Sequence, residues 1–487
     1  TDVNADITTD TTWSKANSPY VLKDFIFVTN GATLTIEAGV TIYGEQGQTI
    51  QGQGVAPTLI ITQGSKINAV GTADAPIIFT SILAKTQTLT QNDKGLWGGL
   101  IMLGYAHING NKQGVTEDPA NADPFIWEIE GLPGIYISSG KGTIPASYRS
   151  YGGSSTTDNS GTLKYVSIRH GGSVLGADNE INGLTLGGVD NGTSLNYIEV
   201  YANNDDGIEF FGGSVNAKYL SIAYCKDDSL DIDDGYNGKI QYVSIIQHGN
   251  DKSNCAIEWD GSSEGTDIGD TKSGALPYSQ PYIMNLTAVG SGADSGSAKS
   301  RGMDIRDNAG GYVLNSIFTE FPNGILKVEN TASSSTKGTQ ATNSSNRGSH
   351  ALLEDGFLGF FGNIFYYGDE TNVSNYPNTA AGVVTESTTA SEVQTLVFDS
   401  ANLNDADVSP ELLNTDLEHG SIMPFPSSTS PAKDGAMPIE GYNDDGFFDV
   451  VAYQGAFASD APADNWLAGW TAVSNPFNVA TGSSSAS

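Results

Sequence analysis

The sequence predicts an all-β fold, a right-handed parallel β-helix (solenoid) with long loop insertions and a C-terminal cap. One motif occurs three times, as NNDDGIEFFGG (203–213), CKDDSLDIDDG (225–235) and KSNCAIEWDG (252–261). A short apolar alternation precedes each copy, and its tyrosine recurs after 22 and then 23 residues, at Tyr197, Tyr219 and Tyr242. A period in the low twenties, with short strands and no helical pattern, is what a β-solenoid requires.

Stacking of successive turns predicts which residues share a column. In a parallel coil each strand pairs with its equivalent one turn away, at about 4.8 Å along the axis. The period-2 alternation then places Ile208, Leu230 and Ile257 in the core. The outward positions form two columns, one of Glu209, Asp231, Glu258 and Asp304, and one of Phe211, Asp233, Asp260 and Arg306. We call the first column the carboxylate ladder.

The carboxylate ladder predicts a cation site. Two carboxylates at this spacing repel by roughly 1 kcal/mol in water, so the stack needs a cation, a shared proton or a nearby base. One hypothesis is a Ca²⁺ site of oxygen ligands, drawn from Glu209, Asp231, Asp233, Glu258, Asp260 and Asp304. The alternative is an acidic solvated face without an ion, relieved by Lys226, Lys252, Arg301 and Arg306.

A catalytic use of the ladder is a weaker hypothesis. If the chain is an enzyme, the candidate residues are Glu209, Asp231, Glu258 and Arg306. A lyase needs an Arg or Lys base beside the ion, and an inverting hydrolase needs carboxyls about 6.5–9.5 Å apart. Any stacked ladder meets these distances easily, so the pattern alone does not identify a reaction centre. We expect His170, in RHGG, to be structural, and the DDG sequences to be turns.

Composition excludes some partners and leaves others open. Only 16% of the 487 residues are charged, yet the net charge is −34. Because the 22 Lys and Arg form no basic run, nucleic acid is not an expected partner. No apolar run approaches the roughly 20 residues of a membrane span, and a start at Thr1 without Met fits a processed, exported protein. Cys225 and Cys255 lie on neighbouring turns but three positions out of register, so a disulfide remains open.

Taken in order, the chain divides into three parts. Residues 1–81 alternate apolar and small polar residues and are the N-terminal cap and first turns. Residues 82–396 are the main β-helix, with insertions at 105–160, 262–280 and 331–349; aromatic residues in the first predict that it is ordered against the body. Residues 397–487 lose the period and are a cap with a flexible tail. Within them, 403–416 is expected to hold a short helix, and Trp466 and Trp470 belong to a cap that blunts the last open sheet edge.

Several phrases also carry a resemblance. TLTIEAGVTIYGEQG, GLWGGLIMLG, LKYVSIRHGGSVLGADNEINGLTLGGV and YQGAFASDAPADNWLAGWT resemble a family of secreted right-handed parallel β-helix proteins. That family is common in Bacteroidota-type and marine Gram-negative bacteria and falls in the pectin-lyase-like class. The resemblance covers nearly the whole chain and implies the fold and export to the outer cell surface.

These observations lead to two functional hypotheses. The first is a non-catalytic, Ca²⁺-stabilised surface protein with a structural, adhesive or glycan-binding role. Its expected partners are an extracellular polysaccharide, other surface proteins or further copies of itself. The alternative is a Ca²⁺-dependent polysaccharide lyase or a glycoside hydrolase that acts in the groove over the ladder.

Overall fold

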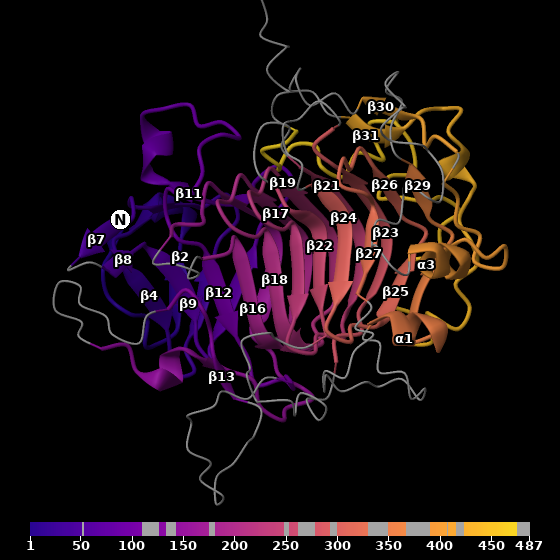
Figure 1. Ribbon diagram of the computed structural model, residues 1–487. Helices are drawn as coiled ribbons and strands as arrows, with labels where there is room; N and C mark the ends of the chain where they lie inside the picture. Colours follow the sequence, from indigo (N-terminus) through magenta and orange to yellow (C-terminus); the bar gives the residue numbers. More distant parts are fainter. Residues whose placement is uncertain are drawn as a thin grey trace, which may run out of the picture.

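The computed structural model is a stack of parallel β-coils (Figure 1). It describes residues 1–50, 53–109, 126–132, 143–174, 181–247, 253–261, 278–292, 300–329, 349–366, 390–406, 408–414 and 423–474. The insertions expected at 262–280 and 331–349, the tail after 474 and Lys252 lie wholly or almost wholly outside these residues. Strands follow one another along the coil from the indigo N-terminal end to the orange C-terminal end.

One face of the coil is a sheet of nine parallel strands. From the C-terminal end to the N-terminal end its strands are β27 (Leu326–Val328), β24 (Arg301–Arg306), β22 (Cys255–Asp260), β20 (Leu230–Asp233), β18 (Ile208–Gly213), β16 (Leu184–Val189), β12 (Leu100–Leu103), β9 (Thr58–Ile61) and β4 (Phe25–Val28). Ile208 pairs with Leu230, which pairs with Ile257. All three are buried in one continuous core, which confirms the predicted register.

The remaining faces form a sheet of sixteen strands that wraps around the core. Its strands are β1 (Asp2–Val3), β2 (Thr11–Trp13), β3 (Tyr20–Leu22), β5 (Thr33–Ile36), β6 (Thr41–Gly44), β10 (Lys66–Val70), β11 (Ile77–Ser81), β15 (Gly161–Arg169), β17 (Ser194–Tyr201), β19 (Ala217–Ala223), β21 (Lys239–Ile246), β23 (Tyr282–Val289), β25 (Gly311–Leu314), β26 (Ile317–Thr319), β28 (Leu358–Phe361) and β29 (Ile364–Tyr366). All of its strand pairs are parallel, so the all-β parallel coil predicted from the period is confirmed.

The recurrent tyrosine marks the bend of the long strands. Tyr165, Tyr197, Tyr219 and Tyr242 have φ values of 50°, 57°, 61° and 62°. This left-handed conformation is uncommon for a residue other than glycine. At each bend the strand passes from one neighbour to the next; β15 pairs with β10 before Tyr165 and with β11 after it. The four rings stack at centroid distances of 4.3, 4.3 and 4.7 Å, and this stack offsets part of the backbone cost.

Short elements complete the fold. The hairpins are β7 (Gln48–Ile50) with β8 (Gln53–Val55), β13 (Trp127–Glu128) with β14 (Ser150–Tyr151), and β30 (Leu412–Asn414) with β31 (Met423–Pro426). The helices are α1 (Ser349–Glu354), α3 (Ala390–Val397) and the 3₁₀ turns η1 (Lys15–Asn17), η2 (Ile82–Lys85), η3 (Ala146–Tyr148) and η5 (Pro431–Lys433). The helix expected within 403–416 is wrong, because the described part of that segment carries strand β30, and helix α3 precedes it.

The C-terminal end of the coil is closed by several segments. Helices α1 and α3 lie beside the last strands (Figure 1), and Leu352 and Val397 join the main core. Asp405 bridges Ile364 on the edge strand β29. These contacts blunt the last sheet edge, as a cap is expected to do.

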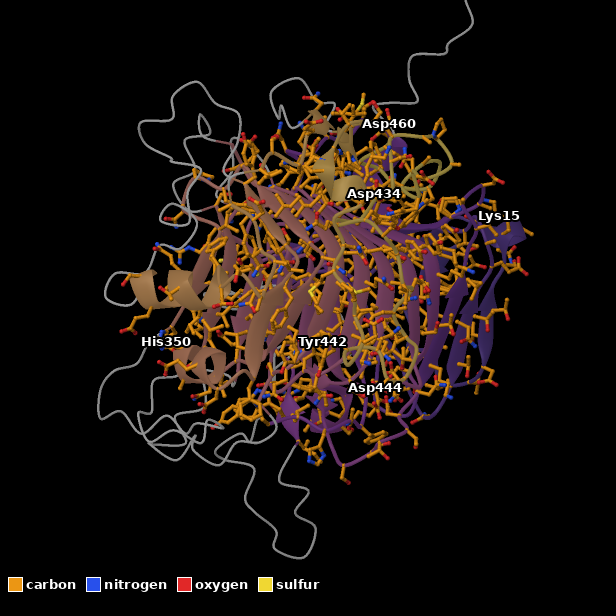
Figure 2. All side chains as sticks on the ribbon, turned by 90° about the vertical axis from the view of Figure 1, so that its right-hand side faces the viewer. Lys15, His350, Asp434, Tyr442, Asp444 and Asp460 are labelled. Atoms are coloured by element: carbon orange, nitrogen blue, oxygen red, sulfur yellow. The ribbon has the colours of Figure 1, made fainter. Side chains whose placement is uncertain are left out.

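The residues after this cap take a course that the sequence does not indicate. Residues 436–474, which we call the C-terminal strap, run back along the outer flank of the sixteen-stranded sheet (Figure 2). Trp470 packs edge-on against Tyr165 and Tyr197, and Trp466 against Tyr219. The expectation that these tryptophans sit on the last turn is therefore wrong, because the tyrosine stack earlier in the coil offers them an aromatic surface.

The described parts of the first insertion pack on the outer face of the nine-stranded sheet. Tyr151, Ile129 and Ile144 are buried in a second apolar cluster with Phe27 and Phe211. The aromatic residues of this insertion thus order it against the body, which confirms the prediction for residues 126–132 and 143–160.

Two further expectations concern the cysteines and the membrane. Cys225 and Cys255 are both buried as free thiols. Of the helices that the structure describes, none has the length and apolar character needed to cross a bilayer.

Candidate cation-binding site

The carboxylate ladder is accompanied by a second column on its N-terminal side. The pairing of β16, β18, β20, β22 and β24 aligns Thr185, Glu209, Asp231, Glu258 and Asp304, as predicted from Glu209 onward. Three positions earlier on each turn lie Asn182, Asp206, Asp228, Cys255 and Arg301. Each rung of the site is therefore a pair of residues, one from each column.

The C-terminal rungs are neutralised by side-chain cations. Arg306 donates two hydrogen bonds to Asp260, at 2.6 and 2.9 Å, and lies 3.0 Å from Glu258. Arg301 and Lys327 both contact Oδ2 of Asp304, at 3.1 and 2.9 Å. These carboxylates already have the counter-charge that the hypothesis of a solvated acidic face assigns to arginine.

The two middle rungs have no such compensation. Asp206, Glu209, Asp228 and Asp231 bring four carboxylates together, and none of them has a cationic partner among the described residues. One oxygen from each of Asp206, Glu209 and Asp231 lies within 4.8 Å of the others. Asp206, Glu209 and Asp228 are only 9%, 5% and 3% exposed, so water screens this group poorly.

Burial and mutual repulsion raise the pKa of these carboxyls. Burial raises the pKa of Asp206 well above its usual value, and the charge of Asp205 adds to the effect. Burial also raises the pKa of Glu209 and of Asp231, helped by Glu130 and by Glu258 respectively. Without a counter-ion these carboxyls therefore hold their protons to a higher pH than free carboxyls do, and a bound cation would favour their ionised form.

Residues from outside the ladder complete the donor set. Asn182 donates its Nδ2 to Glu209 and, at 3.2 Å, to Glu130 of the first insertion. Its Oδ1 is buried and has no hydrogen-bond partner among the residues that the structure describes. Carboxylates with an amide oxygen form a hard oxygen set, which fits the preference of Ca²⁺ for six to eight oxygen ligands.

The structure separates the six predicted metal ligands into different environments. Glu209 and Asp231 meet in the uncompensated group, whereas Asp260 and Asp304 are held by arginine and lysine. Glu258 lies within 4.8 Å of Asp228 and Cys255, and also contacts Arg306. Asp233 accepts a hydrogen bond from the backbone N–H of Asp234 at 2.6 Å.

Sequence reasoning missed Asp206, Asp228 and Asn182 as members of the site. Asp206 and Asp228 occupy the same place in successive copies of the motif, three residues before a ladder carboxylate. That recurrence was a usable signal, although turn chemistry explains the same residues. Asn182 lies outside the repeated motif and could be found only from the strand pairing.

His170 has a structural environment, as expected. Its Nδ1 lies 2.6 Å from the carbonyl oxygen of Asp93, and its own carbonyl accepts a hydrogen bond from Leu96. Burial lowers its pKa to about 4, so the ring is neutral at physiological pH. The side chain holds the segment 93–96 against the coil.

Comparison with known proteins finds one family model and two solved structures that are similar to this chain. A family model described as "Pectate-lyase like beta helix domain" matches residues 5–123 and 133–355. The chain is similar to the pectin methylesterase from Aspergillus niger. The alignment covers 80% of this chain and 95% of that enzyme, at 12% identity and a TM-score of 0.25. It is also similar to the enzymatically active domain of bacteriophage CBA120 tailspike protein 2. That alignment covers 67% of this chain and 41% of the tailspike chain, at 10% identity and a TM-score of 0.19.

Only the family match supports a conclusion. TM-scores this low carry no argument about function, and no curated protein matches the chain. The family model covers well over half of the sequence and includes every turn that bears the ladder. With its parallel coils and stacked core, the chain belongs to the pectate-lyase-like β-helix domain family.

Proposed function

We propose that the chain is an exported, non-catalytic β-helix protein of the outer surface of a Gram-negative cell, stabilised by Ca²⁺. It would serve as a rigid structural, adhesive or glycan-binding component. The observation that carries the proposal is the uncompensated group of Asp206, Glu209, Asp228 and Asp231 beside the unpartnered Oδ1 of Asn182. When bound, Ca²⁺ would supply the positive charge that this group lacks.

The surroundings of the site favour a structural ion. Asp206, Glu209 and Asp231 would hold it, with the amide oxygen of Asn182 as a further ligand. Glu130 reaches the site from the first insertion, so an ion there would also fasten this insertion to the nine-stranded sheet. An ion enclosed in this way is poorly placed to meet a long polymer.

The state of the arginines also favours a non-catalytic role. A lyase needs a free base beside the ion, and Arg306 and Arg301 are both engaged in ion pairs. The neighbouring carboxylates raise the pKa of Arg306, so its guanidinium stays charged.

The alternative is a Ca²⁺-dependent polysaccharide lyase or a glycoside hydrolase. Its support is the raised pKa of Glu209 and Asp231, which a general acid requires. The two roles make different demands, because a hydrolase would use a protonated carboxyl where a structural site would use an ionised one.

One experiment separates these roles. The protein is incubated with a panel of acidic and neutral polysaccharides, with Ca²⁺ or with EDTA, and both retention and new unsaturated or reducing ends are measured. The proposal predicts Ca²⁺-dependent thermal stability and no new chain ends. New chain ends that disappear in Glu209→Gln would establish the alternative. A melting curve that ignores EDTA would remove Ca²⁺ from the proposal.

A further inference from the structure

A pocket of about 570 Å³ lies in the C-terminal strap, where the strap packs on the sixteen-stranded sheet. Residues 436–441, 443–444 and 450–451 line it. The lining is partly aliphatic and includes Met437, Ile439 and Val450, while Glu440 and Asp444 add two carboxylates. The volume is in the range of sites that hold small ligands.

The segment that lines the pocket is held by hydrogen bonds to the coil and within the strap itself. Met437 exchanges two hydrogen bonds with the side chain of Asn315, at 2.8 and 3.1 Å. The backbone N–H of Asp449 donates to Gln241 at 2.9 Å, and Asn443 bonds both backbone groups of Phe448. A pocket held in this way needs little ordering when a ligand enters, which favours binding.

The carboxylates of this segment are of two kinds. Asp445 pairs with Lys239 at 2.7 Å, and Asp449 pairs with Lys218 at 2.9 Å. Glu440 and Asp444, by contrast, have no cationic partner among the described residues. Figure 2 labels Asp444 near Tyr442, on the part of the strap that faces the viewer. Of the four carboxylates in residues 436–451, the two without a cationic partner are therefore those that line the pocket.

The aliphatic part of the lining includes one exposed side chain. Ile439 is 5% exposed and packs in the cluster beneath, whereas Val450 is 77% exposed, the highest value among the large hydrophobic side chains of the described residues. The nearby rings of Tyr442, Tyr312 and Phe361 pack on one another and are not part of the lining. An aliphatic surface beside two unpaired carboxylates is complementary to a lysine or arginine side chain, whose aliphatic stem ends in a cation.

We propose that this pocket binds a basic peptide segment of a partner protein. A lysine or arginine stem would lie on Met437 and Val450, with its charged end between Glu440 and Asp444. The net charge of −34 would attract such a segment from a distance. A bare divalent cation would leave the aliphatic part of the lining unused, and a neutral sugar ring would find few hydrogen-bond partners along it. The inference does not depend on Ca²⁺ at the ladder.

The test is peptide binding to the whole protein by fluorescence anisotropy, in excess Ca²⁺ so that the ladder does not compete. The probe is dye-labelled Lys-Leu-Lys-Leu, compared with the same peptide after lysine acetylation and with Glu-Leu-Glu-Leu. Only the first is expected to bind. We expect Asp444→Asn and Glu440→Gln each to weaken binding by about twofold to fivefold, the range for exposed charge pairs.

One control variant and one further test variant make the result specific to the pocket. Asp460→Asn removes one charge from the same strap at an exposed position outside the pocket and should leave binding unchanged. Val450→Ser keeps every charge and should weaken binding by about threefold or more, because the aliphatic contact is lost. Equal weakening by Asp460→Asn would show a general charge effect and overturn the proposal. Unchanged binding in the Glu440→Gln, Asp444→Asn double variant would also overturn the proposal. Binding of Mg²⁺ or oligosaccharides at the pocket, with no binding of the lysine peptide, would overturn it as well.

Discussion

The backbone N–H of Asp228 donates a hydrogen bond to Oδ1 of Asp206 at 2.8 Å, so one acidic residue is stacked on another in the next turn. This bond satisfies one oxygen of Asp206 but adds no positive charge. The next rung carries Cys255 and Glu258, and Glu258 lies 3.0 Å from Arg306, so compensation begins one turn later. The charge imbalance is thereby confined to the rungs of Glu209 and Asp231.

Asp231→Asn distinguishes a bound ion from a solvated acidic face by the sign of its effect. With Ca²⁺ at about 100 times its Kd, a site gives the parent about 2.7 kcal/mol of stability, and the variant should lose most of this gain. In EDTA the variant should be neutral or more stable, because a repulsion of roughly 1 kcal/mol per neighbour is relieved. Thermal melts in Ca²⁺, Mg²⁺ and EDTA measure both effects. A Ca²⁺ gain that survives in Asp231→Asn, or that Mg²⁺ reproduces, would contradict the ion hypothesis.

The stability of the metal-free protein should fall as pH rises from about 4 to 7. Burial raises the pKa of Asp234 to about 6 and of Asp260 to about 7, whereas aspartates of the unfolded chain titrate near pH 4. The folded protein therefore holds more protons in this window, and ionisation on raising the pH disfavours it. Stabilisation by Ca²⁺ should also grow as the pH rises, because burial raises the pKa of Asp206, Glu209 and Asp231 and the ion binds their ionised forms. A Ca²⁺ shift in melting temperature that is equal at pH 5 and pH 7.5 would contradict this.

Arg306→Gln should make the protein more dependent on Ca²⁺. The change leaves Asp260 and Glu258 without their cation, so we expect a loss of about 1–3 kcal/mol in EDTA. The loss stays below that of a fully buried pair because 28% of the Arg306 side chain is exposed. Arg306→Lys should lose less, since it keeps the charge but not the two-point contact. Urea denaturation with and without Ca²⁺ measures the difference, and equal losses in both conditions would argue against an extended cation site.

Glu199→Gln should release the end of the C-terminal strap. Glu199 is fully buried and accepts hydrogen bonds from the backbone N–H groups of Ala472 and Val473, with Arg169 3.6 Å away. An amide at this position loses acceptor capacity and leaves Arg169 without a charge partner, at a cost of about 1–3 kcal/mol. The expected readout is a change in tryptophan fluorescence from Trp470 and faster proteolysis within 466–474. Asp460→Asn is the control on the same strap. Identical cleavage of the two variants would show that Glu199 does not hold the end of the strap.

The repeating part of the protein could be predicted from the spacing of residues along the chain. The alternation in each motif decides which side chains face the core, and the period decides which of them stack, so Ile208, Leu230 and Ile257 could be paired in advance. The same arithmetic aligned Glu209 with Asp231, Glu258 and Asp304. Local geometry is sufficient here because each coil contacts chiefly the turns before and after it.

The segments that cover the coil, and the carboxylates that gain a counter-charge, depend on contacts between residues far apart in the sequence. The contact of Trp466 with Tyr219 joins residues that are far apart in the sequence, and no period links them. Asp260 and Glu209 both lie in predicted outward columns, yet one meets Arg306 and the other an asparagine and the first insertion. Side-chain reach and the path of the non-repeating segments make this distinction, and the spacing of residues along the chain encodes neither.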